Sequence, residues 1–196
     1  MFYALALVLV SYLLGSVSAA VLVCKLLGKN DPRESGSGNP GATNVLRLHG
    51  KGPAIATLLG DIGKGVVPVL VARWLDLGPL VIGACACAAF LGHLFPIFFG
   101  FRGGKGVATF VGVLLAISPV LGLCFVGLWL LMAAITRYSS LAALTATAAM
   151  PLVGLSLDAP WPYVAAMAVM GSAIFYRHQA NISRLLAGTE GRIGKR

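Results

Sequence analysis

Residues 34–47, ESGSGNPGATNVLR, combine glycines, small polar side chains and an arginine in one short stretch. Glycine lacks a Cβ, so the backbone N–H groups around it can turn toward a bound anion. Arg47 adds a permanently charged, planar guanidinium that matches the geometry of phosphate oxygens. The stretch predicts a phosphate-binding loop, with an ordinary polar linker between two helices as the alternative. Its candidate contacts are Gly36, Ser37, Gly38, Asn39, Gly41, Thr43, Asn44 and Arg47.

The same stretch contains GSGNPG, a formal G-x-G-x-x-G, and Asp61 falls about where the ribose-binding carboxylate of a dinucleotide site would follow. That fingerprint requires a strand before the glycines and a βαβ unit around them. Here the glycines follow an apolar run long enough to span a membrane, and Asp61 lies inside the next such run. The dinucleotide spacing is therefore a coincidence, and the capacity to bind phosphate remains.

Asp61 and Lys64 lie in GDIGKG, within the apolar run of residues 53–72. Because they are three residues apart, they share one face of a helix and can pair. Ionisable groups at membrane depth are costly and are usually paired or functional. Two hypotheses follow: an ion pair that fixes two helices together, or a pair that braces a binding site and contacts a substrate phosphate.

Lys105 lies in GHLFPIFFGFRGGKGVAT, residues 92–109, directly before another apolar run. Glycines and a lysine at a helix N-terminus favour anion binding, so Gly103, Gly104 and Gly106 join Lys105 as candidates. The stretch is not a P-loop, because its glycines are separated by three residues instead of four and glycine replaces the Ser or Thr that binds magnesium. A tight turn between helices, with a lysine that sets topology, is the alternative.

A last polar cluster, YRHQANISR, ends the final apolar run. Arg177, His178 and Asn181 lie close on a helical wheel, and His178 is the candidate base, with an unperturbed pKa of about 6.5. Ser140 directly precedes another apolar run and is a candidate to cap a helix or donate to a ligand. His93 is either a packing residue or a ligand. The alternative for the cluster is a basic helix end that anchors to lipid headgroups.

The elements that must position these residues are membrane segments. The chain of 196 residues is 58% hydrophobic with a mean hydropathy of +0.90, and 11% of its residues are charged, against roughly a quarter in soluble domains. We therefore predict a single all-α integral membrane domain over residues 1–196. No metal-ligand set, cofactor motif or familiar catalytic set is present, so we expect no metal and no cofactor. The apolar runs are residues 2–23, 53–72, 77–99, 107–135, 141–157 and 159–176.

Lysine and arginine positions determine the predicted topology. The run 107–135 exceeds the ~20 residues of one span, and Ser118-Pro119 near its middle favours a break. As one helix, the run leaves seven basic residues on each side. Broken there, it leaves 13 inside and one, Arg73, outside, which the positive-inside rule prefers. We predict about seven segments, some short, with a periplasmic N-terminus and a cytoplasmic C-terminus.

This topology gathers the polar stretches on the cytoplasmic face, above apolar spans. The arrangement suits an anionic polar substrate beside an apolar one. The net charge of +9 indicates attraction to anionic membrane lipid. Nucleic-acid binding is disfavoured because no aromatic platform accompanies the basic residues. A transporter for a phosphorylated metabolite is the alternative class, but it predicts binding groups at mid-membrane and corresponding halves, and no internal repeat is found.

GSGNPGATNVLR, GDIGKG and GHLFPIFFGFRGGKGVAT resemble the signature stretches of the bacterial acyl-phosphate-dependent glycerol-3-phosphate acyltransferases, the PlsY family, and the similarity extends over essentially the whole chain. The resemblance implies an inner-membrane enzyme that transfers a fatty acyl group from a long-chain acyl phosphate to the 1-hydroxyl of glycerol 3-phosphate. The products would be lysophosphatidic acid and phosphate, in the first acylation of phospholipid synthesis. It implies that acyl-CoA and acyl-carrier protein are not direct donors, and that the soluble phosphate acyltransferase is a candidate to dock at the cytoplasmic face.

For that chemistry we expect residues 36–44, Arg47 and Lys105 to hold the acyl phosphate and stabilise the departing phosphate. Ser37, His178 and Asn181 would seat glycerol 3-phosphate, and Asp61 and Lys64 would brace the site. An acyl phosphate is a mixed anhydride with a good leaving group, so positioning and charge stabilisation suffice without a strong nucleophile. The resemblance implies that the donor's own phosphate takes the hydroxyl proton, with His178 as the fallback base.

Overall fold

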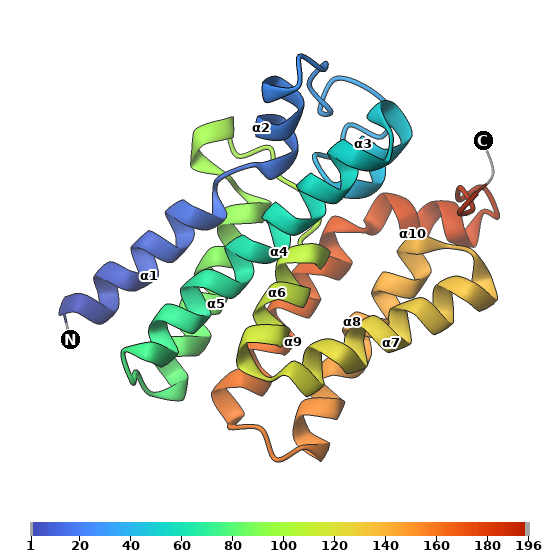
Figure 1. The fold of residues 1–196 in the computed structure, drawn as a ribbon. Coiled ribbons are helices and arrows are strands. Elements are labelled where there is room, and N and C mark those ends of the chain that lie inside the picture. Colours follow the sequence, from blue (N-terminus) through green and yellow to red (C-terminus); the bar gives the residue numbers. More distant parts are fainter. Residues whose placement is uncertain (1, 195–196) are drawn as a thin grey trace.

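The computed structural model describes residues 2–194, and within that range it contains α-helices, one short 3-10 helix and no strand (Figure 1). Lys195 and Arg196, which entered the charge count, lie outside the described residues. The helices are α1 (Phe2–Gly15), α2 (Ala19–Leu26), α3 (Ala42–His49), α4 (Lys51–Trp74), α5 (Pro79–Leu94), η1 (Ile97–Phe99), α6 (Val107–Ile117), α7 (Pro119–Thr136), α8 (Ser139–Ser156), α9 (Trp161–Arg177) and α10 (Gln179–Leu186).

Several helices are long and apolar enough to cross a membrane. Among the described residues four qualify singly: α4, α5 with its extension to Phe99, α7 and α8. The pair α1 and α2 qualifies as one bent span, and α6 is a shorter apolar helix. The predicted all-helical, multi-pass membrane protein is therefore confirmed, whereas the count of seven segments and the orientation of the termini stay predictions.

The predicted break at Ser118-Pro119 is present. Helix α6 ends at Ile117, Ser118 is extended with φ −153° and ψ 122°, and α7 begins at Pro119. A helix end leaves carbonyls without partners, which is costly in a membrane. Arg73, from the last turn of α4, supplies the missing donors to the carbonyls of Ala116 and Ile117, the latter at 3.0 Å.

The first apolar run differs from the prediction. We expected one span over residues 2–23, but α1 ends at Gly15, α2 begins at Ala19, and the two helices are bent by 47°. The Oγ of Ser16 donates to the carbonyl of Tyr12, a contact that favours helix bending. The carbonyl of Val17, freed by the bend, accepts a hydrogen bond of 2.9 Å from Lys64 Nζ.

The polar segment between α2 and α4 contains α3, a helix that the sequence analysis did not predict. Gly41 precedes it with an extended backbone, and Gly50 ends it with φ +86°, a conformation that side chains other than glycine rarely adopt. Helix α3 places Asn44 on its buried side and Arg47 in its last turn. The phosphate-binding stretch is thus part loop and part helix.

Glycines let two helix pairs pack at backbone contact. A Cβ at Gly15 of α1 or at Gly92 of α5 would enter the backbone of the other helix. The same holds for Gly65 of α4 and Gly112 of α6. Small residues at helix crossings are a common solution in membranes, where close van der Waals contact replaces the hydrophobic drive of water. These crossings fix α4, α5 and α6, the helices that carry or adjoin the polar loops.

The polar stretches gather at one end of the helix bundle (Figure 1). The segment between α2 and α3, the loop from η1 to α6, the turn between α7 and α8, and α10 with the C-terminus all lie at this end. The N-terminus and the turns α4–α5 and α8–α9 lie at the opposite end (Figure 1). The predicted clustering of the polar segments is confirmed.

The α1–α5 crossing generates a stability prediction. Replacing Gly92 with alanine should destabilise the protein by about 1–3 kcal/mol, because the added methyl meets the α1 backbone. Thermal unfolding in detergent measures the change. Gly127→Ala in α7 is the control, since a Cβ there meets nothing within 4 Å and alanine favours helix. Equal melting temperatures for the two variants would show that α1 shifts aside without cost.

Candidate active site

A cavity of about 780 Å³ opens among the polar segments and extends between α4, α6 and α7. Its volume lies within the ~300–1,000 Å³ typical of small-molecule sites. Most of the predicted site residues line it, whereas Gly38, Lys64, Gly103 and Gly104 do not. The predicted residues in its lining are Gly36, Ser37, Asn39, Gly41, Thr43, Asn44, Arg47, Asp61, His93, Lys105, Gly106, Ser140, His178 and Asn181.

Asn44 shapes the glycine loop from within. Its Oδ1 accepts from the backbone N–H of Ser37 at 3.0 Å, and its Nδ2 donates to the carbonyls of Pro32 and Ser35 at 2.8 and 3.2 Å. Gly36 has φ +62°, and a Cβ there would run into the Asn44 amide. The side chain that we predicted to face a phosphate is therefore engaged in the loop itself, and it holds the loop against α3.

Arg33 joins the glycine loop to the loop before α6. It pairs with Asp31 at 2.6 Å and donates to the carbonyl of Phe99 at 3.2 Å. The hydrogen bond from Arg33 lowers the pKa of Asp31, so this pair stays charged at neutral pH. The sequence analysis did not single out Arg33. Its contact couples the two glycine-rich loops that form the mouth of the cavity.

Lys105 extends from the glycine-rich turn of residues 103–106, before α6, toward α10. Its Nζ donates to Oδ1 of Asn181 at 2.5 Å. Burial, and then the charge of Arg184, lower the pKa of Lys105 to about 8. The carbonyls of Gly103 and Gly104 accept from Arg177 at 2.8 and 3.2 Å. These two glycines therefore form the turn from which Lys105 extends. This agrees with the alternative given for them in the sequence analysis, a tight turn between helices.

His178 lies buried between α9 and α10. Its Nδ1 is 2.8 Å from the carbonyl of Ile174. A carbonyl only accepts, so Nδ1 carries the proton and Nε2 keeps a free lone pair. Burial lowers the pKa of His178 to about 4, so the ring is neutral at physiological pH. It suits a hydrogen-bond acceptor for a substrate hydroxyl better than a strong base.

Glu190 is a residue of the cavity that the sequence analysis missed. Asp61 is the carboxylate that the sequence analysis singled out, but Glu190 also lines the cavity. Its oxygens accept from Ser140 Oγ at 2.6 Å and from Arg184 Nε at 2.7 Å. Ser140 thus serves the cavity and is not the cap of α8, whose first residue follows Tyr138. The only sequence signal was that Glu190 is the sole carboxylate after Asp158.

Asp61 and Lys64 form the predicted ion pair, deeper in the bundle. Their side chains are nearly fully buried and 2.9 Å apart, and His93 Nδ1 lies 3.4 Å from the same carboxylate oxygen. Lys64 also donates to the carbonyl of Val17. Asp61 and His93 face the cavity while Lys64 faces the bend between α1 and α2. The geometry favours the first hypothesis, an ion pair that fixes helices together. Contact of the pair with a substrate phosphate stays a prediction.

The walls of the inner part of the cavity are apolar. They come from Leu58 of α4, Val111 of α6, and Phe125, Trp129 and Leu130 of α7. Leu58 is 40% exposed and Leu130 is 56% exposed, so the cavity reaches the outer surface of the helix bundle between α4 and α7. One cavity therefore joins a cluster of phosphate-type donors to an apolar channel at membrane depth.

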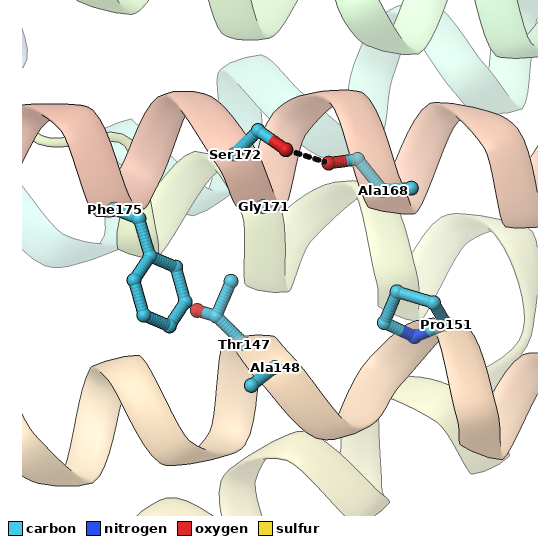
Figure 2. A pocket seen from close by; sticks show the side chains of 7 residues that line it. All are labelled: Thr147, Ala148, Pro151, Ala168, Gly171, Ser172 and Phe175. Carbon is cyan, nitrogen blue, oxygen red and sulfur yellow. Dashed lines mark hydrogen bonds between the residues drawn. The ribbon is translucent and has the colours of Figure 1, made fainter.

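A second hollow, of about 450 Å³, lies between α8 and α9 (Figure 2). Thr147 and Pro151 of α8 face Gly171, Ser172 and Phe175 of α9 across it. The Ser172 hydroxyl donates to the carbonyl of Ala168 within its own helix. None of the predicted site residues lines this hollow. In residues 2–194, no group of three or more His, Cys, Asp or Glu side chains is placed to hold a metal ion.

Comparison with known proteins decides the family. The sequence profile of glycerol-3-phosphate acyltransferases matches residues 5–188. The chain belongs to the glycerol-3-phosphate acyltransferase family. The glycerol-3-phosphate acyltransferase of Thioalkalivibrio sulfidiphilus is 58% identical over 196 residues, covering 100% of this chain and 97% of the relative. That of Neisseria meningitidis serogroup C is 52% identical over 193 residues, with 96% of each chain covered.

Solved structures give the same family and fold. The chain is similar to the crystal structure of PlsY (YgiH), an integral membrane glycerol 3-phosphate acyltransferase, in its glycerol 3-phosphate form, with a TM-score of 0.94 and 43% identity over 98% of this chain and 96% of that one. The lysophosphatidic acid form matches with a TM-score of 0.92 and 42% identity, at the same coverage. The resemblance to the PlsY family is therefore confirmed. This member of the family is an integral membrane protein.

The buried ion pair of this acyltransferase-family chain generates a second prediction. Lys64→Met should destabilise it by about 3–5 kcal/mol, because Asp61 keeps a buried charge and the Val17 carbonyl loses its donor. Unfolding by SDS titration measures the loss. The double variant Asp61→Asn with Lys64→Met should recover a substantial part, since no charge is left unpaired. A double variant as unstable as Lys64→Met alone would contradict the ion-pair account.

Proposed function

We propose that this protein transfers a long-chain acyl group from acyl phosphate to the 1-hydroxyl of sn-glycerol 3-phosphate. The products are 1-acyl-glycerol 3-phosphate, which is lysophosphatidic acid, and inorganic phosphate. The single observation that carries the proposal is the cavity. It joins a polar end, where Arg47 and Lys105 lie, to an apolar channel between α4, α6 and α7. Family membership and the glycerol 3-phosphate and lysophosphatidic acid forms of the PlsY structures support the acceptor and the product.

The donor set at the polar end suits two phosphate groups. Arg47 and Lys105 supply the charges. The backbone N–H groups of Asn39, Ala42 and Thr43, all residues of the cavity lining, supply neutral donors. Those of Ser37, Gly38 and Gly41 already donate within the protein. Lys105 uses one of its three N–H donors on Asn181, so two remain for a ligand. We assign the phosphate group of the acyl phosphate to Arg47, Lys105 and the glycine loop of residues 36–44. Glycerol 3-phosphate is assigned to Ser37, His178 and Asn181, with Ser140 alongside.

The transfer needs positioning more than a nucleophile of the protein. The 1-hydroxyl oxygen of glycerol 3-phosphate attacks the acyl carbon, a new ester bond forms, and the bond from that carbon to the phosphate oxygen breaks. Arg47 and Lys105 stabilise the negative charge on the carbonyl oxygen and the departing phosphate. The hydroxyl proton passes to the donor's phosphate. His178 Nε2 orients the hydroxyl, and its lowered pKa, about 4, supports a substrate acceptor for the proton.

The same proposal includes orientation and location. Seven segments, a periplasmic N-terminus and a cytoplasmic C-terminus in the bacterial inner membrane place the cavity mouth toward the cytoplasm. The positive-inside count supports this orientation: among the cations of residues 2–194 that lie at helix ends or in loops, Arg73 is the one at the opposite end of the bundle. Glycerol 3-phosphate then enters from water and the acyl donor from the membrane. The soluble phosphate acyltransferase that makes the donor is proposed to dock at this cytoplasmic face.

Phosphate release by the purified protein in lipid tests the proposal. Palmitoyl phosphate with glycerol 3-phosphate should give phosphate and lysophosphatidic acid, whereas palmitoyl-CoA should give no product. Arg47→Ala and Lys105→Ala should each lower kcat/KM by about tenfold or more, because each removes charge stabilisation of the leaving phosphate. Near wild-type turnover in both variants would refute the phosphate assignment. No release, with flux of glycerol phosphate into vesicles, would refute the enzyme and favour a transporter.

The pKa of Lys105 generates a pH prediction. Its ammonium is charged below a pKa of about 8 and loses its charge as pH rises through that value. Therefore kcat/KM, which reports the free protein, should fall on the alkaline side of pH 8. A Lys105→Arg variant stays charged there and should lose this alkaline limb, whatever its absolute rate. A wild-type profile that stays flat well above pH 8 would contradict the assignment.

A further inference from the structure

The carboxylate of Glu190 holds three donors at the polar end of the cavity. Its Oε1 accepts from Ser140 Oγ at 2.6 Å and from Asn181 Nδ2 at 2.7 Å, and its Oε2 accepts from Arg184 Nε at 2.7 Å. These donors come from α8 and α10, so Glu190 links two helices that α9 separates along the chain. The phosphate assignment above gives Glu190 no role.

Glu190 and Lys105 together determine which way the Asn181 amide points. An ionised carboxylate only accepts hydrogen bonds, and a lysine ammonium only donates them. The amide nitrogen of Asn181 must therefore face Glu190, and its oxygen must face Lys105, as the two contacts have it. Without the carboxylate, the amide is free to rotate and present its NH₂ group to Lys105, which is a donor-to-donor contact. The orientation of Asn181 thus depends on a residue beyond α10.

The segment that carries Glu190 is fastened over the cavity mouth. Ile193 exchanges two backbone-directed hydrogen bonds with Arg137: its N–H donates to the Arg137 carbonyl at 2.7 Å, and its carbonyl accepts from the Arg137 guanidinium at 3.0 Å. Gly191 lines the cavity, and a Cβ there would lie 3.7 Å from the Arg47 guanidinium. The segment of residues 187–194 therefore reaches from α10 past Arg47 to the turn before α8.

We infer that Glu190 is a positioning residue for the acyl transfer: it orients the Asn181 amide toward Lys105, sets the Ser140 hydroxyl, and holds residues 187–194 as one wall of the polar end. The inference rests on the proposed function and extends it to the C-terminal segment. Glu190 touches no reacting atom in this assignment. It acts through Asn181, which the proposed function assigns to glycerol 3-phosphate, and through Ser140 beside it.

Glu190 also adds a negative charge to a strongly basic site. The charged and titratable groups around Lys105 are Arg184, Arg177, Arg47 and Glu190, with His178 on the neighbouring helix turn. The three arginines lower the pKa of Lys105, whereas Glu190 raises it. Replacing Glu190 with a neutral residue should therefore move the alkaline limb of the activity profile to lower pH. A residue with a purely structural role would leave that limb in place.

Two variants separate the contacts of Glu190 from its charge. In Glu190→Gln, Oε1 still accepts from Asn181 and Ser140, so the amide orientation survives. The charge and the Arg184 contact are lost, because the new NH₂ group cannot accept a hydrogen bond. In Glu190→Ala, the amide orientation is lost as well. We expect Glu190→Ala to lower kcat/KM for glycerol 3-phosphate by about tenfold or more and Glu190→Gln to restore most of that loss. In Glu190→Gln the alkaline limb should shift to lower pH.

The assay uses the full chain in lipid, with palmitoyl phosphate as donor, and kinetic constants are normalised to folded protein by thermal melting. Asp158→Asn is the matched control, because Asp158 is exposed, lies in the α8–α9 turn at the opposite end of the bundle, and is outside the cavity lining. Wild-type kinetics for Glu190→Ala per folded molecule would overturn the inference. The inference would also be overturned if kcat/KM were no higher in Glu190→Gln than in Glu190→Ala. The same holds if the alkaline limb of the pH profile stayed at the wild-type pH in Glu190→Gln. A wild-type protein without turnover would instead refute the proposed function.

Discussion

Carbonyl groups freed by breaks in membrane helices are the constraint on which this structure depends. Within a bilayer no water satisfies such groups, so each break needs a donor from elsewhere in the protein. Lys64 supplies it at the α1–α2 bend, Arg73 at the α6–α7 break, and Arg177 at the glycine loop before α6. Tyr12 does so for Phe95, where α5 ends. Arg73 and Arg177, which indicate topology in the sequence, thus also help to make an interrupted helix bundle possible, together with Lys64 inside its span.

The breaks in turn create the site. The α6–α7 break allows α7 to run back toward the polar end, where Phe125, Trp129 and Leu130 of α7 wall the cavity together with Leu58 of α4. Arg33 and Arg177 tie the loops to each other and to α9, so Lys105 extends from a fixed turn. The polar end is pre-organised around carbonyl and carboxylate acceptors, which is the condition under which charge stabilisation is effective.

Local chemistry and charge made much of this predictable from the sequence. The Ser118 break followed from proline geometry and from the distribution of lysine and arginine, and the Asp61–Lys64 pair followed from helical spacing. The bend after Gly15 had a weaker signal, because Ser16 and Ser18 are small residues that also occur inside membrane helices. Ser16 follows α1 and donates back to the carbonyl of Tyr12 in its last turn. Helix α3 is short and polar, so no apolar period indicated it. Glu190 reaches the cavity through contacts between segments far apart in sequence, which spacing along the chain cannot indicate.

The side opening between Leu58 and Leu130 has a consequence for kinetics. An acyl substrate that reaches the cavity through this opening is met in the plane of the bilayer, so its effective concentration is its mole fraction among the lipids and not its amount per volume. Diluting the donor with inert lipid would then slow the reaction at constant bulk concentration, while glycerol 3-phosphate would follow ordinary solution kinetics. The single-chain product can return by the same opening without its acyl chain crossing water.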